Sequence, residues 1–191
     1  MNEKEYEKVD RTINLLKANL ISIIFFILVF SINGAVYYKI WGESVRLIIN
    51  GNNNMYMLVL IIIFIILHEF IHGISFSIAQ GVTWKDIKLG FNIKTLTPYA
   101  HCKVPISANI YKMAILLPTI IVGFLPTIIG LVLGIKTLVF VGSFLIVCGT
   151  GDFMIYWVIR KYDEKALIYD HPVKAGCEVY LPKNNIIIKI N

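Results

Sequence analysis

The sequence predicts an all-α membrane protein with four transmembrane helices and a small cytoplasmic β-hairpin or sheet. Its 191 residues are 57% hydrophobic and only 16% charged, and the mean hydropathy is +0.72. Four apolar segments are each long enough, at about 1.5 Å per helical residue, to cross a hydrocarbon layer of about 30 Å. Most of the positive charge lies outside these four segments.

The first helix is predicted over residues 18–38. It follows a charged segment, residues 1–17, and is longer than the apolar core of a signal peptide. No convincing small-residue cleavage site accompanies it. We therefore expect this helix to be retained as a membrane anchor.

The other three helices are predicted over residues 55–80, 113–135 and 137–159. The third contains several glycines and prolines, which would argue against a helix in water but are tolerated in lipid. Little more than Lys136 joins the third helix to the fourth, so these two should form an antiparallel hairpin. Because no repeat or low-complexity linker interrupts the chain, we treat residues 1–191 as a single integral membrane domain.

The distribution of positive charge predicts the orientation of the helices, because Lys and Arg collect on the cytoplasmic side of a membrane. Fifteen of the 18 Lys and Arg residues lie in residues 1–17, in the loop 81–112 and in the tail 160–191. We expect a multi-pass protein of the cell membrane with this loop and both termini in the cytoplasm. The net charge of +6 then serves contacts with the lipid bilayer and does not indicate a nucleic-acid partner.

Short strands are predicted in the cytoplasmic segments. Residues 87–94 alternate between apolar and polar side chains, which is typical of a half-buried strand, and a turn at residues 97–99 would lead into a second strand through residues 102–104. In the tail, residues 179–181 and 186–190 resemble two strands joined by a polar turn. We expect all of these strands to join one small sheet.

The four predicted helices contain only four residues of the types Asp, Glu, His, Lys and Arg: His68, Glu69, His72 and Asp152. Such groups cost several kcal/mol each in hydrocarbon unless they are paired or bind a metal, so each is a functional candidate. On a helix, positions i and i+4 share a face, so His68 and His72 can present two imidazole nitrogens to one Zn²⁺ ion, while Glu69 can take a proton from water. The alternative, two core histidines that cap polar neighbours, offers few partners for three such groups in five residues.

Asp152 is the predicted third zinc ligand. Counting from the predicted cytoplasmic ends of their helices, Asp152 and His72 lie at the same depth, about 12 Å from the end. Gly149 and Gly151 are small enough to let the fourth helix approach the second closely. The alternative is that Asp152 pairs with a nearby cationic or tyrosine side chain.

Three other residues are weaker candidates for zinc ligands. His101 and His171 are rival third ligands, but both fall in predicted cytoplasmic segments, where an isolated histidine is usually solvated. The segment 170–172 is predicted to be a turn in which the aspartate accepts a local hydrogen bond. Cys148 is predicted to be a small packing residue.

Several short motifs carry a family resemblance: LHEFIHG at residues 67–73, PYAHCKVP at 98–105, Pro118, GTGD at 149–152 and DHPVKAGC at 170–177. In these motifs the chain resembles a bacterial family of zincin peptidases, formerly listed only as a domain of unknown function. The resemblance implies a zinc-dependent peptidase that uses the HExxH motif.

The chain is also similar to intramembrane metalloproteases of the site-2 protease type, which bind zinc through HExxH on one transmembrane helix and an aspartate on a later one. This similarity implies that Asp152 is the third ligand. The chain departs from that group around the aspartate, which lies there in a Leu-Asp-Gly context, whereas here Gly151 precedes Asp152 and Phe153 follows it.

The expected function is hydrolysis of a peptide bond in a membrane-associated protein or peptide, with zinc held by His68, His72 and Asp152 and with Glu69 as the general base. Because a transmembrane helix has its amides hydrogen-bonded, a substrate would unwind locally, and the predicted hairpin could hold the unwound segment as an added strand. Three alternatives remain: a zinc hydrolase of a non-peptide membrane substrate, a catalytically silent zinc-binding scaffold, and a transporter that relays protons or ions.

Overall fold

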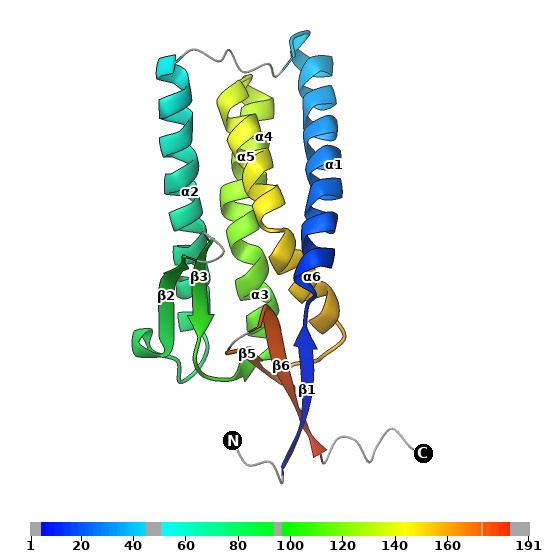
Figure 1. The fold of residues 1–191 in the computed structure, drawn as a ribbon, viewed down its shortest axis with the longest axis vertical. Helices are drawn as coiled ribbons and strands as arrows, with labels where there is room; N and C mark the ends of the chain where they lie inside the picture. Colours follow the sequence, from blue (N-terminus) through cyan, green and yellow to red (C-terminus); the bar gives the residue numbers. More distant parts are fainter. Residues whose placement is uncertain (1–4, 45–50, 94–96, 173, 184–191) are drawn as a thin grey trace.

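A computed structural model of the chain describes residues 5–44, 51–93, 97–172 and 174–183. Long helices that run side by side make up most of the molecule (Figure 1). In chain order the helical elements are α1 (Leu15–Trp41), α2 (Gly51–Ser77), the 3-10 turn η1 (Trp84–Asp86), α3 (Ala108–Pro118), the π-helical segment η2 (Thr119–Phe124), α4 (Leu125–Leu133), α5 (Lys136–Cys148) and α6 (Thr150–Ile159).

Three helical stretches in the described part of the chain are long and apolar enough to cross a membrane: Leu16–Trp41, Met55–Ser77 and Ala108–Leu133. The pair α5 and α6 makes a fourth if the bend of 43° between them lies within one span. The prediction of several apolar spans is therefore confirmed, with two differences. The third stretch begins at Ala108 rather than at residue 113, and the fourth is broken after Cys148.

Local hydrogen bonds set both ends of α1. The side chain of Asn14 accepts hydrogen bonds from the N–H groups of Leu16 and Lys17, at 2.9 and 3.2 Å, and so satisfies donors that a helix start leaves open. At the other end Gly42 has φ of 68° and its N–H donates to the carbonyl of Tyr38 at 2.8 Å. Glycine adopts this left-handed conformation without the steric cost of a Cβ, so the helix stops there.

The antiparallel arrangement of α4 and α5 depends on close backbone contact. A Cβ atom at Gly130 would lie 2.7 Å from the backbone nitrogen of Val139 and 2.9 Å from the carbonyl oxygen of Ile135. Only glycine permits this approach, and the chain then turns through Gly134, which has φ of 71°. The hairpin predicted around Lys136 is present.

Strands gather at the end of the molecule where both termini lie (Figure 1). One sheet has two antiparallel strands, β2 and β3, and the other has four strands in the order β1-β6-β5-β4. The strands are β1 (Tyr6–Thr12), β2 (Ile87–Asn92), β3 (Thr97–Cys102), β4 (Ile106–Ser107), β5 (Leu167–Asp170) and β6 (Gly176–Pro182).

Two predictions about the strands need correction, and one strand was not predicted. Residues 97–99 do not form a turn, because they begin β3, whose Pro98 faces Phe91 at a position of the ladder that needs no N–H donor. The hairpin and the tail strands lie in two separate sheets. The charged N-terminal segment forms β1, paired along its length with β6, a partner too distant in sequence for a local pattern to reveal. The strand predicted at 186–190 falls outside the described residues.

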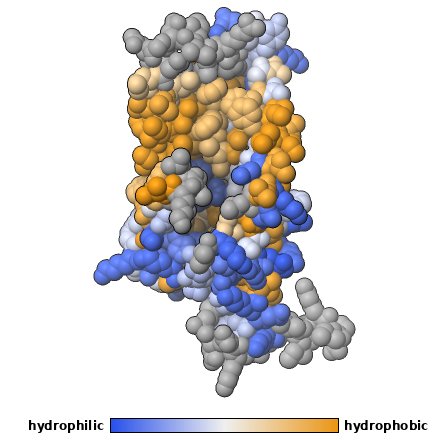
Figure 2. All heavy atoms as spheres, in the orientation of Figure 1, coloured by the Kyte–Doolittle hydropathy of each residue, from blue (hydrophilic) through white to orange (hydrophobic). Residues whose placement is uncertain are grey.

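The surface divides into an apolar belt and a polar end. Figure 2 shows hydrophobic side chains along the helices and hydrophilic ones gathered where the strands and the termini lie. Exposed apolar residues of α1 and α2 form much of this belt; Leu20, Ile24 and Ile66 are about 60% exposed. Such an area of exposed hydrocarbon suits a lipid environment.

Candidate metal centre

Two histidines of α2 form one side of the site. His68 and His72 are one helical turn apart and each is only 6% exposed. Their ring centroids lie 4.9 Å apart, so the two imidazoles face the same space. The i, i+4 spacing therefore places both rings on one buried helix face, as the HExxH motif predicts.

Asp152 approaches these histidines from the first turn of α6. Its Oδ2 atom lies 3.2 Å from Nε2 of His68 and 3.5 Å from Nε2 of His72. The break at Gly149 ends α5 and starts a new helix just before Asp152. A helix N-terminus favours negative charge, so the break also stabilises the carboxylate in an apolar setting.

The ligand atoms of His68, His72 and Asp152 are spaced suitably for binding one zinc ion. Their candidate ligand atoms lie within 4.8 Å of one another. Atoms about 2.0–2.2 Å from a tetrahedral zinc ion lie roughly 3.4 Å apart, which is close to the two distances to Asp152. Nδ1 of His72 lies 3.0 Å from the carbonyl oxygen of Ala114. When Nδ1 carries the proton, this bond orients the ring and leaves the Nε2 lone pair for a metal.

Glu69 and a strand border the same cavity. The cavity has a volume of about 510 Å³ and is lined by residues of α2, α3, α5, α6 and the two sheets. Glu69 lines it beside the histidines, and β3 lines it with Pro98, Tyr99 and Ala100. Glu69 does not belong to the candidate ligand group of the described residues, which leaves its carboxylate available for proton transfer.

The glycines beside Asp152 act differently from the prediction. A Cβ atom at Gly149 would lie 2.1 Å from Oγ1 of Thr119, in η2, and Gly151 has no heavy atom within 4 Å of a Cβ position. Gly149 therefore lets the break in the fourth helix pack against the third helix, not against α2. The prediction that both glycines bring the fourth helix close to the second is wrong.

Gly149→Ala is expected to lower the free energy of unfolding by about 1–3 kcal/mol, because the new methyl group overlaps the buried Thr119 side chain. It should also weaken zinc binding by displacing Asp152. Thermal unfolding and zinc titration measure the two effects. Thr119→Ala in the same chain should restore part of the loss, and Gly151→Ala should cause none. Equal unfolding temperatures for Gly149→Ala and the wild type would contradict the packing argument.

Asp170 and Tyr111 form a second polar group in the cavity, which no sequence pattern predicted. The Asp170 carboxylate accepts hydrogen bonds from the Cys102 N–H, at 2.7 Å, and from the Tyr111 hydroxyl. Burial raises the pKa of Asp170, although both hydrogen bonds and nearby His101 oppose the shift. The predicted local hydrogen bond at a turn is therefore wrong. The motif DHPVKAGC did mark this aspartate, but its partners lie far away in sequence.

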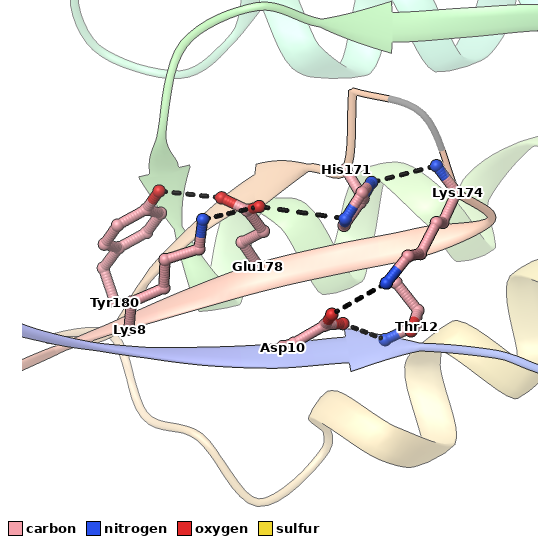
Figure 3. Close-up of polar contacts among 7 residues, drawn as sticks. All are labelled: Lys8, Asp10, Thr12, His171, Lys174, Glu178 and Tyr180. Carbon is pink, nitrogen blue, oxygen red and sulfur yellow. Dashed lines mark hydrogen bonds and ion pairs between the residues drawn. The ribbon is translucent and has the colours of Figure 1, made fainter.

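The two rival histidines lie outside the candidate ligand group of the described residues. Nδ1 of His101 is 3.8 Å from Asp170. His171 lies in the β5–β6 connection, where its Nδ1 accepts a hydrogen bond from the Lys174 N–H and its Nε2 is 3.9 Å from Glu178 (Figure 3). Both histidines therefore contact acidic residues of the four-stranded sheet, Asp170 in β5 and Glu178 in β6.

Figure 3 also shows the polar partners of Glu178, which is buried. Burial raises the pKa of its carboxyl, but hydrogen bonds from Lys8 and from the Tyr180 hydroxyl, both at 2.8 Å, outweigh burial and lower the pKa. This cluster fastens β1 to β6.

Cys148 is exposed and lines the cavity, which corrects its prediction as a packing residue. The bend after α5 turns its side chain into the open space. It is not a member of the candidate ligand group among the residues that the structure covers.

Taken together, the apolar helices, the buried His-His-Asp group and the adjacent glutamate define a helical protein with a zincin-type candidate metal site. Residues 61–167, more than half of the chain, match the family described as "Putative zincin peptidase", and the chain belongs to this family. The resemblance to the family is thereby confirmed; the similarity to site-2 proteases stays a prediction. The chain matches no curated protein and no solved structure.

Proposed function

We propose that this protein is a membrane-embedded zinc metallopeptidase that hydrolyses a peptide bond in a membrane-associated protein or peptide. The observation that carries the proposal is the convergence of His68, His72 and Asp152 beside Glu69 in one cavity among apolar helices. Family membership supports the same chemistry.

The proposed roles follow from the positions of the side chains. His68, His72 and Asp152 would hold the metal, and zinc bound there would supply a Lewis acid for a carbonyl oxygen and for water. Glu69 takes a proton from a water molecule in the cavity on its carboxylate oxygen and later gives it to the leaving nitrogen. The hydrogen bond from Nδ1 of His72 to Ala114 keeps one ligand oriented throughout.

The membrane setting rests on the apolar belt and on the charge distribution. The belt follows the helices, while hydrophilic side chains gather at the end with the strands (Figure 2), which the described parts of the Lys- and Arg-rich loop and tails form. The proposed orientation therefore places both termini and the loop in the cytoplasm of a multi-pass protein of the cell membrane. The site then lies inside the bilayer toward its cytoplasmic side.

The substrate proposed for this site is an extended segment. A helical transmembrane segment hides its amides, so the segment must unwind before hydrolysis. β3 lines the cavity with Pro98, Tyr99 and Ala100, and its edge away from β2 faces the site. An unwound segment lying along this edge would pass the proposed metal position as an added strand.

The experiment that tests the proposal combines zinc content with proteolysis. Purified protein is expected to hold about one zinc per chain, and cells that express it should accumulate membrane-protein fragments whose new termini disappear after chelation in isolated membranes and return with added zinc. Mass spectrometry of protein termini measures them even when the substrate is unidentified. Zinc binding without any zinc-dependent terminus would reject the peptidase and favour a silent scaffold or a non-peptide hydrolase.

A further inference from the structure

Asp170 is a buried acid that lines the cavity of the metal site without a lysine or arginine partner. Its ion-pair contact is with His101, whose Nδ1 lies 3.8 Å from Oδ2, and no Lys or Arg of the described chain pairs with it. The described residues that line the cavity include no Lys or Arg either. Buried carboxylates are usually paired with a cation or bind a metal. A cation for Asp170 would therefore have to come from a molecule that enters the cavity.

Two hydrogen bonds hold the Asp170 carboxylate in place but bring no positive charge. Oδ2 accepts from the Cys102 N–H at 2.7 Å, and Oδ1 accepts from the Tyr111 hydroxyl. Each carboxylate oxygen has two lone pairs, so each can accept a further hydrogen bond. Burial raises the pKa of this carboxyl although both bonds oppose the rise, so the ionised form is incompletely stabilised. A lysine or arginine side chain would supply the missing stabilisation.

Helix α3 relates Asp170 to the metal site. The Tyr111 hydroxyl donates to Asp170, and the carbonyl oxygen of Ala114, three residues further along α3, lies 3.0 Å from Nδ1 of His72. Three helical residues rise about 4.5 Å, and side chains on a helix tilt toward its N-terminus. That end of α3 follows β4, at the end of the molecule where the strands gather (Figure 1). Asp170 therefore lies on the strand side of the metal site, about one helical turn away along α3.

The other two acids of the cavity have a different role. Glu69 and Asp152 line it with Asp170, and the double charge of a zinc ion would balance these two carboxylates. Asp170 would remain as the acid that has no cation.

The position of Asp170 suits a feature of membrane segments. In the proposed orientation the strand side is cytoplasmic, and the cytoplasmic flanks of transmembrane segments are rich in Lys and Arg. An extended peptide rises about 3.3 Å per residue, so a cation that reaches Asp170 lies within about four residues of the bond at the metal site. A segment bound in this way would have its apolar part on the membrane side of the site.

We propose that Asp170 is a specificity-determining residue that binds a lysine or arginine side chain of the substrate. The favoured substrate is then a membrane-associated segment that is cut close to its positively charged cytoplasmic flank. This inference rests on the proposed peptidase function and deepens it, because it names the side chain that the cavity selects. Cys102 and Tyr111 fix the carboxylate that makes the selection.

A peptide mixture tests the selection of charge without knowledge of the natural substrate. Membrane proteins are cut after glutamate, and the peptides are divided into a dimethylated portion, in which lysine keeps its positive charge, and an acetylated portion, in which lysine is neutral. Zinc-loaded wild-type protein in detergent should cleave lysine-containing, arginine-free peptides with a kcat/KM about 10- to 100-fold higher in the dimethylated portion, as expected for a hydrogen bond between charged groups. Peptides without lysine show how much of this difference comes from the modified terminal amine. Equal cleavage of the two portions would overturn the proposal.

Asp170→Asn tests whether this carboxylate makes the selection. The new side chain has the same size, its carbonyl can accept from the Cys102 N–H, and its amide can donate to the Tyr111 oxygen. The ratio of the two portions should fall to within about twofold of unity while zinc stays bound. Tyr111→Phe is the matched control, because it removes a hydrogen bond but keeps the charge, and it should keep the wild-type ratio. An equal loss of both rates in Asp170→Asn, with the ratio unchanged, would show that Asp170 only holds β3 and α3 together.

A binding measurement separates this inference from the proposed function. Immobilised, zinc-loaded Glu69→Gln protein should retain dimethylated lysine peptides in preference to acetylated ones, and adding Asp170→Asn should abolish the preference. Charge-selective retention without any cleavage by the wild type would reject the peptidase and keep the cation site. Cleavage without a charge preference would reject the cation site and keep the peptidase, and the absence of both would reject both.

Discussion

Glu69→Gln is expected to reduce proteolysis by about 10²- to 10⁴-fold while zinc stays bound. The substitution keeps the size of the side chain and one acceptor oxygen, but it removes the basic carboxylate. His68, His72 and Asp152 are untouched, so the candidate ligand group remains complete. The loss should therefore appear in kcat and not in metal content.

The measurement compares zinc-dependent protein termini in membranes from cells with the wild type and with Glu69→Gln at equal expression. Glu164→Gln, an exposed acid beyond α6, is the matched control and should behave like the wild type. Cleavage that persists in Glu69→Gln would remove Glu69 as the base. Loss of zinc together with activity would place Glu69 in the ligand group instead.

Asp152→Ala and His68→Ala are expected to lower zinc affinity by well over 100-fold, because loss of a direct ligand should exceed the 10- to 100-fold cost of losing an outer hydrogen-bond partner. The Asp152 carboxylate is also the only negative charge in the candidate ligand group of the described residues. Without it, the two histidines would leave the double charge of the ion uncompensated in an apolar cavity.

Zinc content of the purified variants tests this result directly. His101→Ala and His171→Ala are the matched controls, because each removes a histidine that lies outside the candidate ligand group, and both should keep about one zinc per chain. If Asp152→Ala retains zinc and a control loses it, the ligand assignment must change. Circular dichroism of each variant separates loss of metal from loss of fold.

The helices were predictable because their signal is local. Apolar runs of more than twenty residues identify a span whatever its neighbours are, and the three continuous ones agree with the prediction to within a few residues. The break at Gly149 was not predicted, because it depends on contact with Thr119 in another helix. β1 was missed for the same reason, since its partner β6 lies at the other end of the described chain.

In the candidate site, too, the residues related by local geometry were predictable and the contacts between distant segments were not. His68, Glu69 and His72 lie within one helical turn, so helix geometry alone relates them. Asp152 was reached by counting depth along two helices, and the structure brings it to the histidines. The hydrogen bonds of Asp170 to Tyr111 and to Cys102 in β3 join segments that are far apart in sequence. No spacing rule could predict them.

The pairing of β1 with β6 has a consequence for how the protein is made. The ribosome makes β1 before the described helices and β6 after them, although the two strands pair along their length, with Tyr6 opposite Pro182. Until β6 is made, β1 lacks its partner strand, and an unpaired strand is a target for proteases and for incorrect pairing. Chains that stop before Gly176 lack β6 and therefore leave β1 without its partner.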